Sequence, residues 1–355
     1  MVQTIRTADL LELTVKEQAS DLHITAGHPP ILRISGRLVP LEKYAVVTPE
    51  ESQSFAFSIM TEDQKKRFAA TRDIDFSYSY EDKGRFRVNV FVQQQTVSCA
   101  LRLIPQKIQT LEELNLPPVL SQFTKLSQGF VIVTGPSGHG KSTTLASLVD
   151  QINHERAEHI VTIEDPIEYI FADDLSVIAQ REVGEDTESF SKALRATFRQ
   201  DPDVIMVGEM RDSETIATAL TAAETGHLVF ATLHTNSAAQ TLHRIVDSFS
   251  AEQQAQIRAQ LSGSLRGVIS QRLIPRTKGG LIPACEVLMV TPAVANLIRE
   301  NKSHEIPMVI ETGAEQGMVS LNRALANLVR GREITLDHAL AYSLNPMELR
   351  TLAKS

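Results

Sequence analysis

The stretch TGPSGHGKSTTLASLVD, residues 134–150, joins two kinds of sequence. Before it, the run GFVIV at residues 129–133 is short and apolar, which is typical of a buried strand. After its glycines, apolar residues recur at the spacing of one helix face, at Leu145, Leu148, Val149 and Ile152. The order of strand, glycine-rich turn and helix predicts an α/β fold that is built around this joint.

The same stretch fits the pattern G-x-x-x-x-G-K-[ST] of a phosphate-binding loop, the P-loop, here residues 135–142. Glycines let the backbone curl so that successive N–H groups point inward, and the amino terminus of the following helix adds partial positive charge. Such a loop binds ATP, with Lys141 at the β- and γ-phosphates and the Ser142 hydroxyl on Mg²⁺. A glycine-rich turn without a ligand is the simpler alternative, and the strand and helix around the pattern argue against it. The predicted nucleotide-binding residues are Gly135, Ser137, Gly138, His139, Gly140, Lys141, Ser142 and Thr143.

Composition places the chain among ordinary globular proteins and narrows the classes of function. Of its 355 residues, 42% are hydrophobic and 22% charged, so the chain is long enough for two domains and is neither disordered nor fibrous. The net charge of -8 argues against a protein that binds nucleic acid. Two cysteines, Cys99 and Cys285, are too few for a disulfide framework or a zinc knuckle, and no apolar run reaches the ~20 residues of a membrane span. We expect a reduced, cytoplasmic protein.

Two segments near the amino terminus, residues 84–92 and 96–104, alternate between apolar and polar residues. Strict alternation predicts half-buried strands with the apolar residues on one face. The arginines Arg85, Arg87 and Arg102 then lie on the opposite face, where a solvated surface is the ordinary interpretation. Phosphoryl transfer often needs an arginine from outside the P-loop domain, so Arg87 and Arg102 are also candidates for that role.

A proline-rich segment, residues 104–120, interrupts both periods and marks a domain boundary. We expect a smaller α+β domain at residues 1–105, a linker at 106–118 and an α/β domain at 119–355. In the second domain short apolar runs alternate with helical patterns, which predicts a parallel sheet flanked by helices. From about residue 291 the pattern is helical, with Pro292 at a helix start.

Candidate catalytic acids follow two apolar runs of the second domain. Glu164 ends the run that begins at residue 160, and Glu209 follows the run at residues 204–207. Because the carboxyl ends of parallel strands meet at the edge where the P-loop lies, both acids are expected to converge on the phosphates. Acids at that place hold the metal and orient the attacking water. A helix cap or a surface ion pair is the alternative for either acid alone.

Two histidines flank the apolar run at residues 228–233, His227 near its start and His234 at its end. By the same end-of-strand argument, His234 is the better candidate to contact the γ-phosphate. A lone histidine is more often a structural residue, and that alternative applies to both.

Four motifs stand in order along the second domain: GPSGHGKST at 135–143, TIEDPIEY at 162–169, DVIMVGEMRD at 203–212 and TGHLVFATLHTNSA at 225–238. They resemble the Walker A motif, the Asp box, the Walker B motif and the His box of the secretion ATPase superfamily. Over nearly its full length the chain resembles the branch of PilT-type pilus retraction ATPases. The resemblance implies a PAS-like amino-terminal domain, a RecA-like P-loop ATPase domain and a homo-hexameric ring.

The resemblance also implies roles for particular residues. Glu164 would polarise the attacking water, and Glu209 would support Mg²⁺ through a water molecule. His227 and His234 match the two histidines of the His box, which adds His227 to the nucleotide-binding residues. Arg87 and Arg102 would lie near a nucleotide across a domain or subunit boundary.

In function, the resemblance implies ATP hydrolysis that powers pilin disassembly and twitching motility at the cytoplasmic face of the inner membrane. The implied partners are a PilC-like platform protein of that membrane and a second retraction ATPase. An accessory ATPase of PilU type stays open, because the tail at residues 315–335 also resembles that branch. A motor for pilus extension or type II secretion is a further alternative, although such motors typically carry a four-cysteine zinc insertion that this sequence lacks. From other classes, a RecA-like ATPase that depends on nucleic acid and a nucleotide-binding switch stay open.

Overall fold

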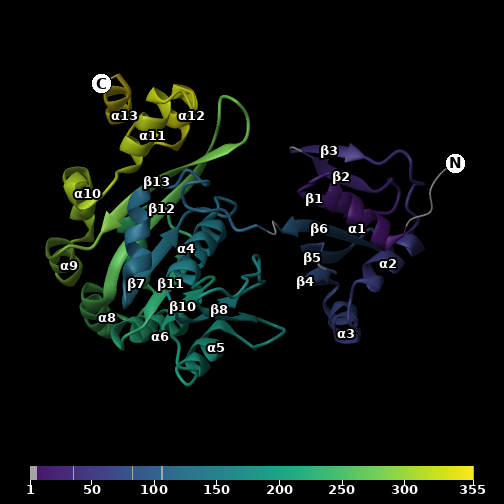
Figure 1. Cartoon of the computed structure of the whole chain (residues 1–355), viewed down its shortest axis with the longest axis horizontal. Helices are drawn as coiled ribbons and strands as arrows, with labels where there is room; N and C mark the ends of the chain where they lie inside the picture. The colour runs from purple at the N-terminus through teal and green to yellow at the C-terminus, as the bar shows by residue number, and fades with distance from the viewer. Residues whose placement is uncertain (1–5, 35, 82, 105–106, 355) are drawn as a thin grey trace. The chain divides into compact units, whose positions relative to one another are not determined.

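The computed structural model describes residues 6–34, 36–81, 83–104 and 107–354 (Figure 1). The chain forms two compact units. The first contains Met1–Lys107 together with Pro166–Ile170, and the second contains Ile108–Asp165 together with Phe171–Ser355. The boundary that we predict at Pro105 and Gln106 lies outside the described residues.

The first unit is a six-stranded antiparallel sheet with three helices. The strand order is β3-β2-β1-β6-β5-β4. The strands are β1 Asp21–Ile24, β2 Ile31–Ile34, β3 Arg37–Pro40, β4 Asp73–Tyr80, β5 Gly84–Gln93 and β6 Thr96–Ile104. The helices are α1 Thr7–Lys16, α2 Pro49–Ser58 and α3 Glu62–Thr71.

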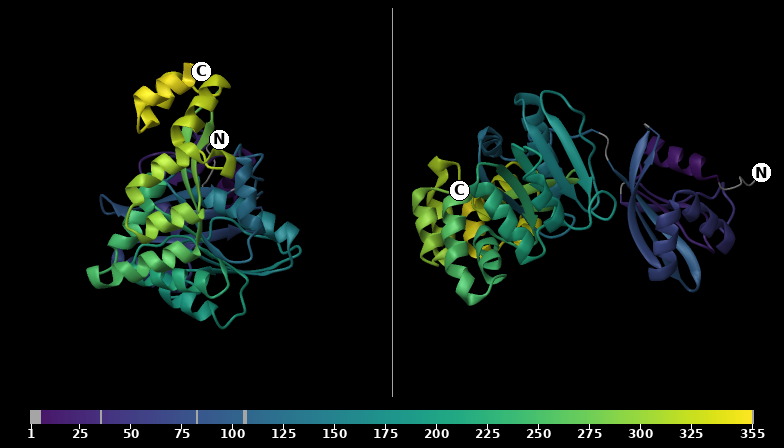
Figure 2. Two further views of the ribbon diagram at one scale, coloured as in Figure 1. Left: turned by 90° about the vertical axis from the view of Figure 1, so that its left-hand side faces the viewer. Right: turned by 90° about the horizontal axis from the view of Figure 1, so that it is seen from below.

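One face of this sheet is apolar and carries all three helices (Figure 2). The alternation predicted for β5 is observed, because Phe86, Val88 and Val90 are fully buried in the core beneath the helices. The opposite face carries the arginines. Arg87 and Arg102 are direct partners in the register of β5 and β6, so the two side chains lie side by side.

The second unit is built on a seven-stranded sheet with the order β13-β12-β7-β11-β10-β8-β9. All neighbouring strands are parallel except β12 and β13, which form an antiparallel hairpin. The predicted α/β class is confirmed. The strands are β7 Gly129–Thr134, β8 His159–Glu164, β9 Val177–Glu182, β10 Val204–Val207, β11 Leu228–Leu233, β12 Leu265–Pro275 and β13 Leu281–Met289.

Helices cover both faces of the seven-stranded sheet. One apolar core joins strand residues such as Ile132 and Val207 to helices α5 Phe190–Thr197, α6 Ser213–Glu224, α7 Ala238–Asp247 and α8 Ala251–Ser264. Helix α4, Lys141–Glu155, is absent from that core and packs against β7, β11 and the 3₁₀ helix η1, Pro118–Lys125. Because β7, β11, β10 and β8 run in the same direction, their carboxyl ends meet at one edge of the sheet.

The carboxyl-terminal region is helical and forms two groups. The first contains α9 Pro292–Arg299 and α10 Ile306–Thr312, which contribute to the core of the sheet. The second contains α11 Leu321–Arg330, α12 Leu336–Tyr342 and α13 Pro346–Lys354, which gather at the tip of the β12–β13 hairpin (Figure 1). Across the described ranges, no helix combines the length and the apolar character that crossing a membrane requires.

Candidate nucleotide site

The P-loop links β7 to α4 through three glycines with positive φ. The φ angles are 148° at Gly135, 76° at Gly138 and 79° at Gly140. These values lie in the region that glycine adopts without the steric cost of a Cβ atom. At Gly135 a Cβ atom would also lie 2.4 Å from the backbone oxygen of Gln271. The curled backbone that the sequence predicts is therefore possible only with glycine at this position.

Lys141 lies inside the curl of the loop and is only 8% exposed. Its Nζ atom donates to the backbone oxygens of Gly135 at 2.8 Å and Pro136 at 3.0 Å. Ser142, the next residue, is exposed at the first turn of α4. The ammonium group is therefore held where phosphate oxygens of a bound nucleotide would compete for its protons.

His234, at the end of β11, connects the P-loop to Glu209, which follows β10. Its Nδ1 atom lies 3.3 Å from Lys141 Nζ, and its Nε2 atom lies 3.0 Å from Glu209 Oε1. Burial alone raises the pKa of Glu209, but the hydrogen bond from Arg211 and the charges of His234 and Lys141 outweigh it, so this pKa lies below its ordinary value. The structure thus brings together three residues that the sequence predicts for the site.

The P-loop is fastened to the neighbouring strand β12 by two side chains. The amide nitrogen of Gln271 donates to the backbone oxygen of His139 at 2.9 Å, and the Gln271 oxygen accepts from the Thr144 hydroxyl at 2.7 Å. The His139 Nδ1 atom accepts the N–H of Leu273 at 2.9 Å. These bonds hold the P-loop and the start of α4 against β12.

A chain of hydroxyl groups fastens the loop after β11 to the strand before the P-loop. Thr134 Oγ1 accepts the N–H of Thr235 at 2.9 Å, and the Thr235 hydroxyl lies 2.6 Å from the hydroxyl of Thr241 in α7. Because Thr235 directly follows His234, these bonds determine where the His234 ring lies relative to Lys141.

Glu164 ends β8 and is 6% exposed. Its Oε1 atom accepts from the Thr162 hydroxyl at 2.7 Å and from the Gln180 amide at 3.1 Å. It lies at the predicted edge of the sheet, and the two donors named here come from β8 and from the edge strand β9.

The structure does not bring His227 to the P-loop of its own chain. The His227 ring lies at the amino end of β11, where Nδ1 lies 2.9 Å from the backbone oxygen of Ala222 and the ring packs edge-on against Phe198. A strand of this length spans about 20 Å. His227 therefore lies at the opposite end of the strand from His234, away from the P-loop of its own chain, and its contact with a nucleotide stays a prediction.

Arg87 and Arg102 belong to the first unit, where each lies beside a carboxylate. Arg87 Nη1 lies 3.6 Å from Glu168 Oε1, and Arg102 Nε lies 3.0 Å from Asp21 Oδ1. Their side chains remain 40% and 67% exposed. The predicted shared face of the two arginines is observed.

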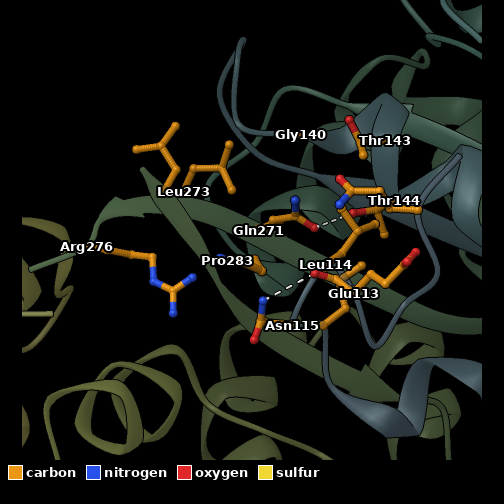
Figure 3. Close-up of a pocket in the computed structure, with 13 residues that line it drawn as sticks. Glu113, Leu114, Asn115, Gly140, Thr143, Thr144, Gln271, Leu273, Arg276 and Pro283 are labelled. Atoms are coloured by element: carbon orange, nitrogen blue, oxygen red, sulfur yellow. Dashed lines mark hydrogen bonds between the residues drawn. The ribbon is translucent and has the colours of Figure 1, made fainter. Parts of the chain in front are cut away.

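A cavity of about 290 Å³ opens beside the P-loop within the second unit (Figure 3). Gly140 and Thr143 form one wall, and Leu273 and Pro283 of the β12–β13 hairpin form another. Glu113 and Asn115, together with their neighbours, form a third wall. The lining is partly apolar and partly polar, which suits the base and ribose of a nucleotide whose phosphates lie on the P-loop.

Sequence reasoning identified Gly140 and Thr143 in this cavity but missed its other two walls and the contact of Gln180. Glu113 and Asn115 fall in the segment that we predict as a linker, and Leu273 and Gln180 lie in strands without a recognised motif. Only the three-dimensional fold brings them to the site, since Gln271 and Thr144 are separated by 127 positions in sequence. The polar residues Glu113 and Asn115 inside the proline-rich linker are the one sequence signal that could have pointed to this wall of the cavity.

Comparison with known proteins places this geometry in context. The family model described as "Type II/IV secretion system protein" matches residues 3–333. The chain is 46% identical to the type IV pilus retractation ATPase PilT of Pseudomonas aeruginosa, over 93% of this chain and 96% of that protein. It is 42% identical to the type IV pilus ATPase PilU of the same organism, over 97% of this chain and 90% of that protein.

The structural comparison agrees with the sequence comparison. A crystal structure of the pilus retraction motor PilT with bound ADP matches with a TM-score of 0.91 and 46% identity, and the match covers 98% of this chain and 99% of that one. The ATPase DotB of Legionella pneumophila matches with a TM-score of 0.80 and 28% identity, over 94% of this chain and 93% of that one. The chain therefore belongs to the type II/IV secretion system protein family, in which it is similar over nearly its whole length to PilT-type retraction ATPases.

Proposed function

We propose that this chain hydrolyses ATP as a motor for type IV pilus retraction, working as a homo-hexamer. The observation that carries the proposal is the contact of His234 with both Lys141 and Glu209, at 3.3 Å and 3.0 Å. This contact joins the Walker A, Walker B and His box motifs around one P-loop, and phosphoryl transfer from a nucleoside triphosphate depends on charged groups positioned in this way. The identity to PilT over nearly the full length of both chains supports the same conclusion.

In the proposed site the P-loop holds the phosphates, and the cavity beside Gly140 and Thr143 takes the base and ribose. Lys141 leaves the backbone oxygens that it bonds and turns to the β- and γ-phosphates. Glu164 orients the attacking water, and His234 contacts the γ-phosphate. His234 also keeps the Glu209 carboxylate in place through its Nε2 atom.

The residues present fit a magnesium ion. Glu209 has a lowered pKa and is therefore ionised at neutral pH, and Ser142 offers an exposed hydroxyl close to the phosphates. Carboxylate, hydroxyl and water oxygens are the ligands that Mg²⁺ prefers. Ser142 would bind the ion directly and Glu209 through water. When bound, Mg²⁺ would neutralise charge on the β- and γ-phosphate oxygens.

Arg87 and Arg102 supply cations to a nucleotide across a unit or subunit boundary in this proposal. Like charges directly opposite each other in an antiparallel pair destabilise a sheet. The protein nevertheless places these two arginines as register partners and leaves both partly exposed. Glu168 and Asp21 offset part of this repulsion, and the exposed parts of the two guanidinium groups remain able to contact a negatively charged ligand at this face.

The proposed location is the cytoplasmic face of the inner membrane, and none of the helices in the described part of the chain could cross that membrane. There the ring would act on a platform protein of that membrane, with a second retraction ATPase as a further partner. The 46% identity to the type IV pilus retractation ATPase PilT supports retraction, and the 42% identity to the type IV pilus ATPase PilU supports a function at the pilus.

The test is deletion of the gene in the native host, with complementation by the wild-type chain and by Lys141→Ala. Retraction predicts that the deletion strain keeps surface pili but loses twitching, that the wild type restores it, and that Lys141→Ala does not. Loss of the pili themselves would instead indicate an extension motor.

Purified protein whose ATP turnover is unaffected by Lys141→Ala would refute the assignment of the P-loop. An accessory role of the PilU kind predicts that twitching remains in the deletion strain until a second retraction ATPase is also removed.

A further inference from the structure

Strands β8 and β9 place four polar residues together beside the P-loop edge. The two strands are parallel, and their register pairs Thr162 with Gln180 and Glu164 with Glu182. Because side chains alternate along a strand, residues two apart and their register partners share one face of the sheet. Thr162, Glu164 and Gln180 are therefore neighbours on the same face, and Thr162 is fully buried there.

Both donors in this group bond the same atom of Glu164. The Thr162 hydroxyl and the Gln180 amide nitrogen donate to Oε1, at 2.7 Å and 3.1 Å. Two donors on one oxygen, one from each strand, define the torsion of the carboxylate as well as its position. The carboxylate therefore has one preferred direction, although its side chain has three rotatable bonds.

The Gln180 amide is itself held from its other end. Its Oε1 atom accepts the N–H of Phe171 at 3.0 Å. An amide that accepts through oxygen from a backbone N–H must present its nitrogen on the other side, so the N–H₂ group faces Glu164. Gln180 thus contacts both Glu164 and Phe171, the residues on either side of segment 165–170.

We infer that Gln180 is a positioning residue for hydrolysis, which aims the Glu164 carboxylate at the attacking water. The inference rests on the proposed role of Glu164. Gln180 need not touch the nucleotide, because it acts through the carboxylate that it holds. A misplacement of a catalytic group by about 1 Å costs on the order of 100-fold in rate. A residue that only orients the Glu164 carboxylate can therefore have a large effect on the rate.

The chemistry of glutamine suits this task better than that of a cation. A lysine or arginine at position 180 would form an ion pair with Glu164 and stabilise its charged form, which weakens it as a proton acceptor. A neutral amide orients the carboxylate without cancelling its charge. A methionine of similar length would fill the space and give no donor.

Two variants separate the positioning role from a purely structural one. Gln180→Glu keeps an oxygen that can accept the N–H of Phe171, but it removes the donor to Glu164 and places a like charge beside that carboxylate. Gln180→Met removes both bonds. Positioning predicts that both variants lose kcat for ATP by about 10- to 100-fold, while the Kd for fluorescent ADP changes by less than about threefold. A normal kcat for Gln180→Glu together with a reduced kcat for Gln180→Met would overturn the inference, because it would show that only the bond to Phe171 matters.

A double-mutant comparison tests whether Gln180 acts through Glu164. Once Glu164→Gln has removed the carboxylate, adding Gln180→Met should change kcat by less than about twofold, because no carboxylate remains to be aimed. An equal loss in the Glu164→Gln background and in the wild type would refute the inference. If Glu164→Gln alone leaves kcat unchanged, the proposed role of Glu164 fails instead. Thermal unfolding of each assembled variant, unchanged from the wild type, is the control for folding.

Discussion

At the scale of single residues, His139 shows how one P-loop side chain depends on its protonation state. Its Nδ1 atom accepts the Leu273 N–H, so the ring forms this bond only while Nδ1 keeps its lone pair. Burial, followed by the positive charges of Arg272 and Lys141, lowers the pKa of His139 below its ordinary value. The folded protein therefore favours the neutral ring.

This lowered pKa predicts a stability that falls on acidification. Near pH 7 and above, the ring is neutral in both states and contributes no pH dependence. As the pH falls through about 6.5, the unfolded chain takes up a proton that the folded chain resists, so the free energy of unfolding decreases until the folded pKa is reached. Asparagine offers an oxygen to Leu273 and does not titrate, so His139→Asn should lose less stability than the wild type between about pH 7.5 and about pH 5.5. Equal losses in denaturant unfolding of the two proteins would contradict this account.

The sequence predicts single residues well where one local motif defines the geometry. The positions of Lys141, Ser142 and the P-loop glycines follow from spacing and from the strand and helix on either side. The bond of His139 to Leu273 could not be predicted, because it joins residues 134 positions apart. His227 is the opposite case. The His box motif implies a contact with the nucleotide there, but within one chain the His227 ring lies against Ala222, at the amino end of β11.

At the scale of elements, the turn from β7 into α4 does not tolerate a side chain at Gly135. The space for a side chain at Gly135 is taken by a backbone oxygen of β12, which cannot rotate away as a side chain would. The strand order places β12 directly beside β7, so the close approach is a consequence of the sheet itself.

We therefore predict that Gly135→Ala lowers the free energy of unfolding by about 3 kcal/mol, from backbone strain together with overpacking. Gly279→Ala is the matched control. Gly279 also has a positive φ, 88°, but nothing lies within 4 Å of a Cβ placed there, so only strain of about 1 kcal/mol applies. Denaturant unfolding of the two variants gives the comparison, and equal losses would show that the contact with Gln271 is not limiting.

Element types were predictable for the central strands, because β7, β8, β10 and β11 are short segments rich in apolar residues next to helical patterns. The neighbours of those strands were not predictable. Strand β9, with the pattern VIAQRE, is partly exposed and has only three apolar residues at its start, yet it supplies Gln180. The cavity walls likewise come from the β12–β13 hairpin and from residues 109–116, which meet only in the folded chain.

At the scale of the whole molecule, the residues of the proposed reaction are divided between two compact units. Lys141, Glu164, Glu209 and His234 belong to the second unit, and Arg87 and Arg102 belong to the first. Composition and length predict two domains. They carry no information on assembly, because contacts between subunits produce no periodic pattern of residues in the sequence. The hexamer is therefore a proposal that needs an experiment on mixed subunits.

If the arginines serve a nucleotide bound to another subunit, two inactive variants should restore each other. Lys141→Ala lacks a working P-loop but keeps its arginines, and Arg102→Ala keeps the P-loop. Rings assembled from both, isolated through two different affinity tags, should hydrolyse ATP faster than rings of either variant alone. Mixed rings no faster than the average of the two pure rings would argue for arginines that act within one subunit, and mixed rings of wild type with Lys141→Ala are the control for exchange.

The segment Pro166–Ile170 belongs to the first unit, although the chain on both sides of it belongs to the second. The backbone therefore passes between the units at three places instead of one. A truncated protein that starts at residue 108 would retain this short insert after losing the surroundings that it packs against, and the insert begins two residues after Glu164. The loss would reach the end of the strand that carries Glu164, so kinetic measurements on such a fragment would not represent the intact chain.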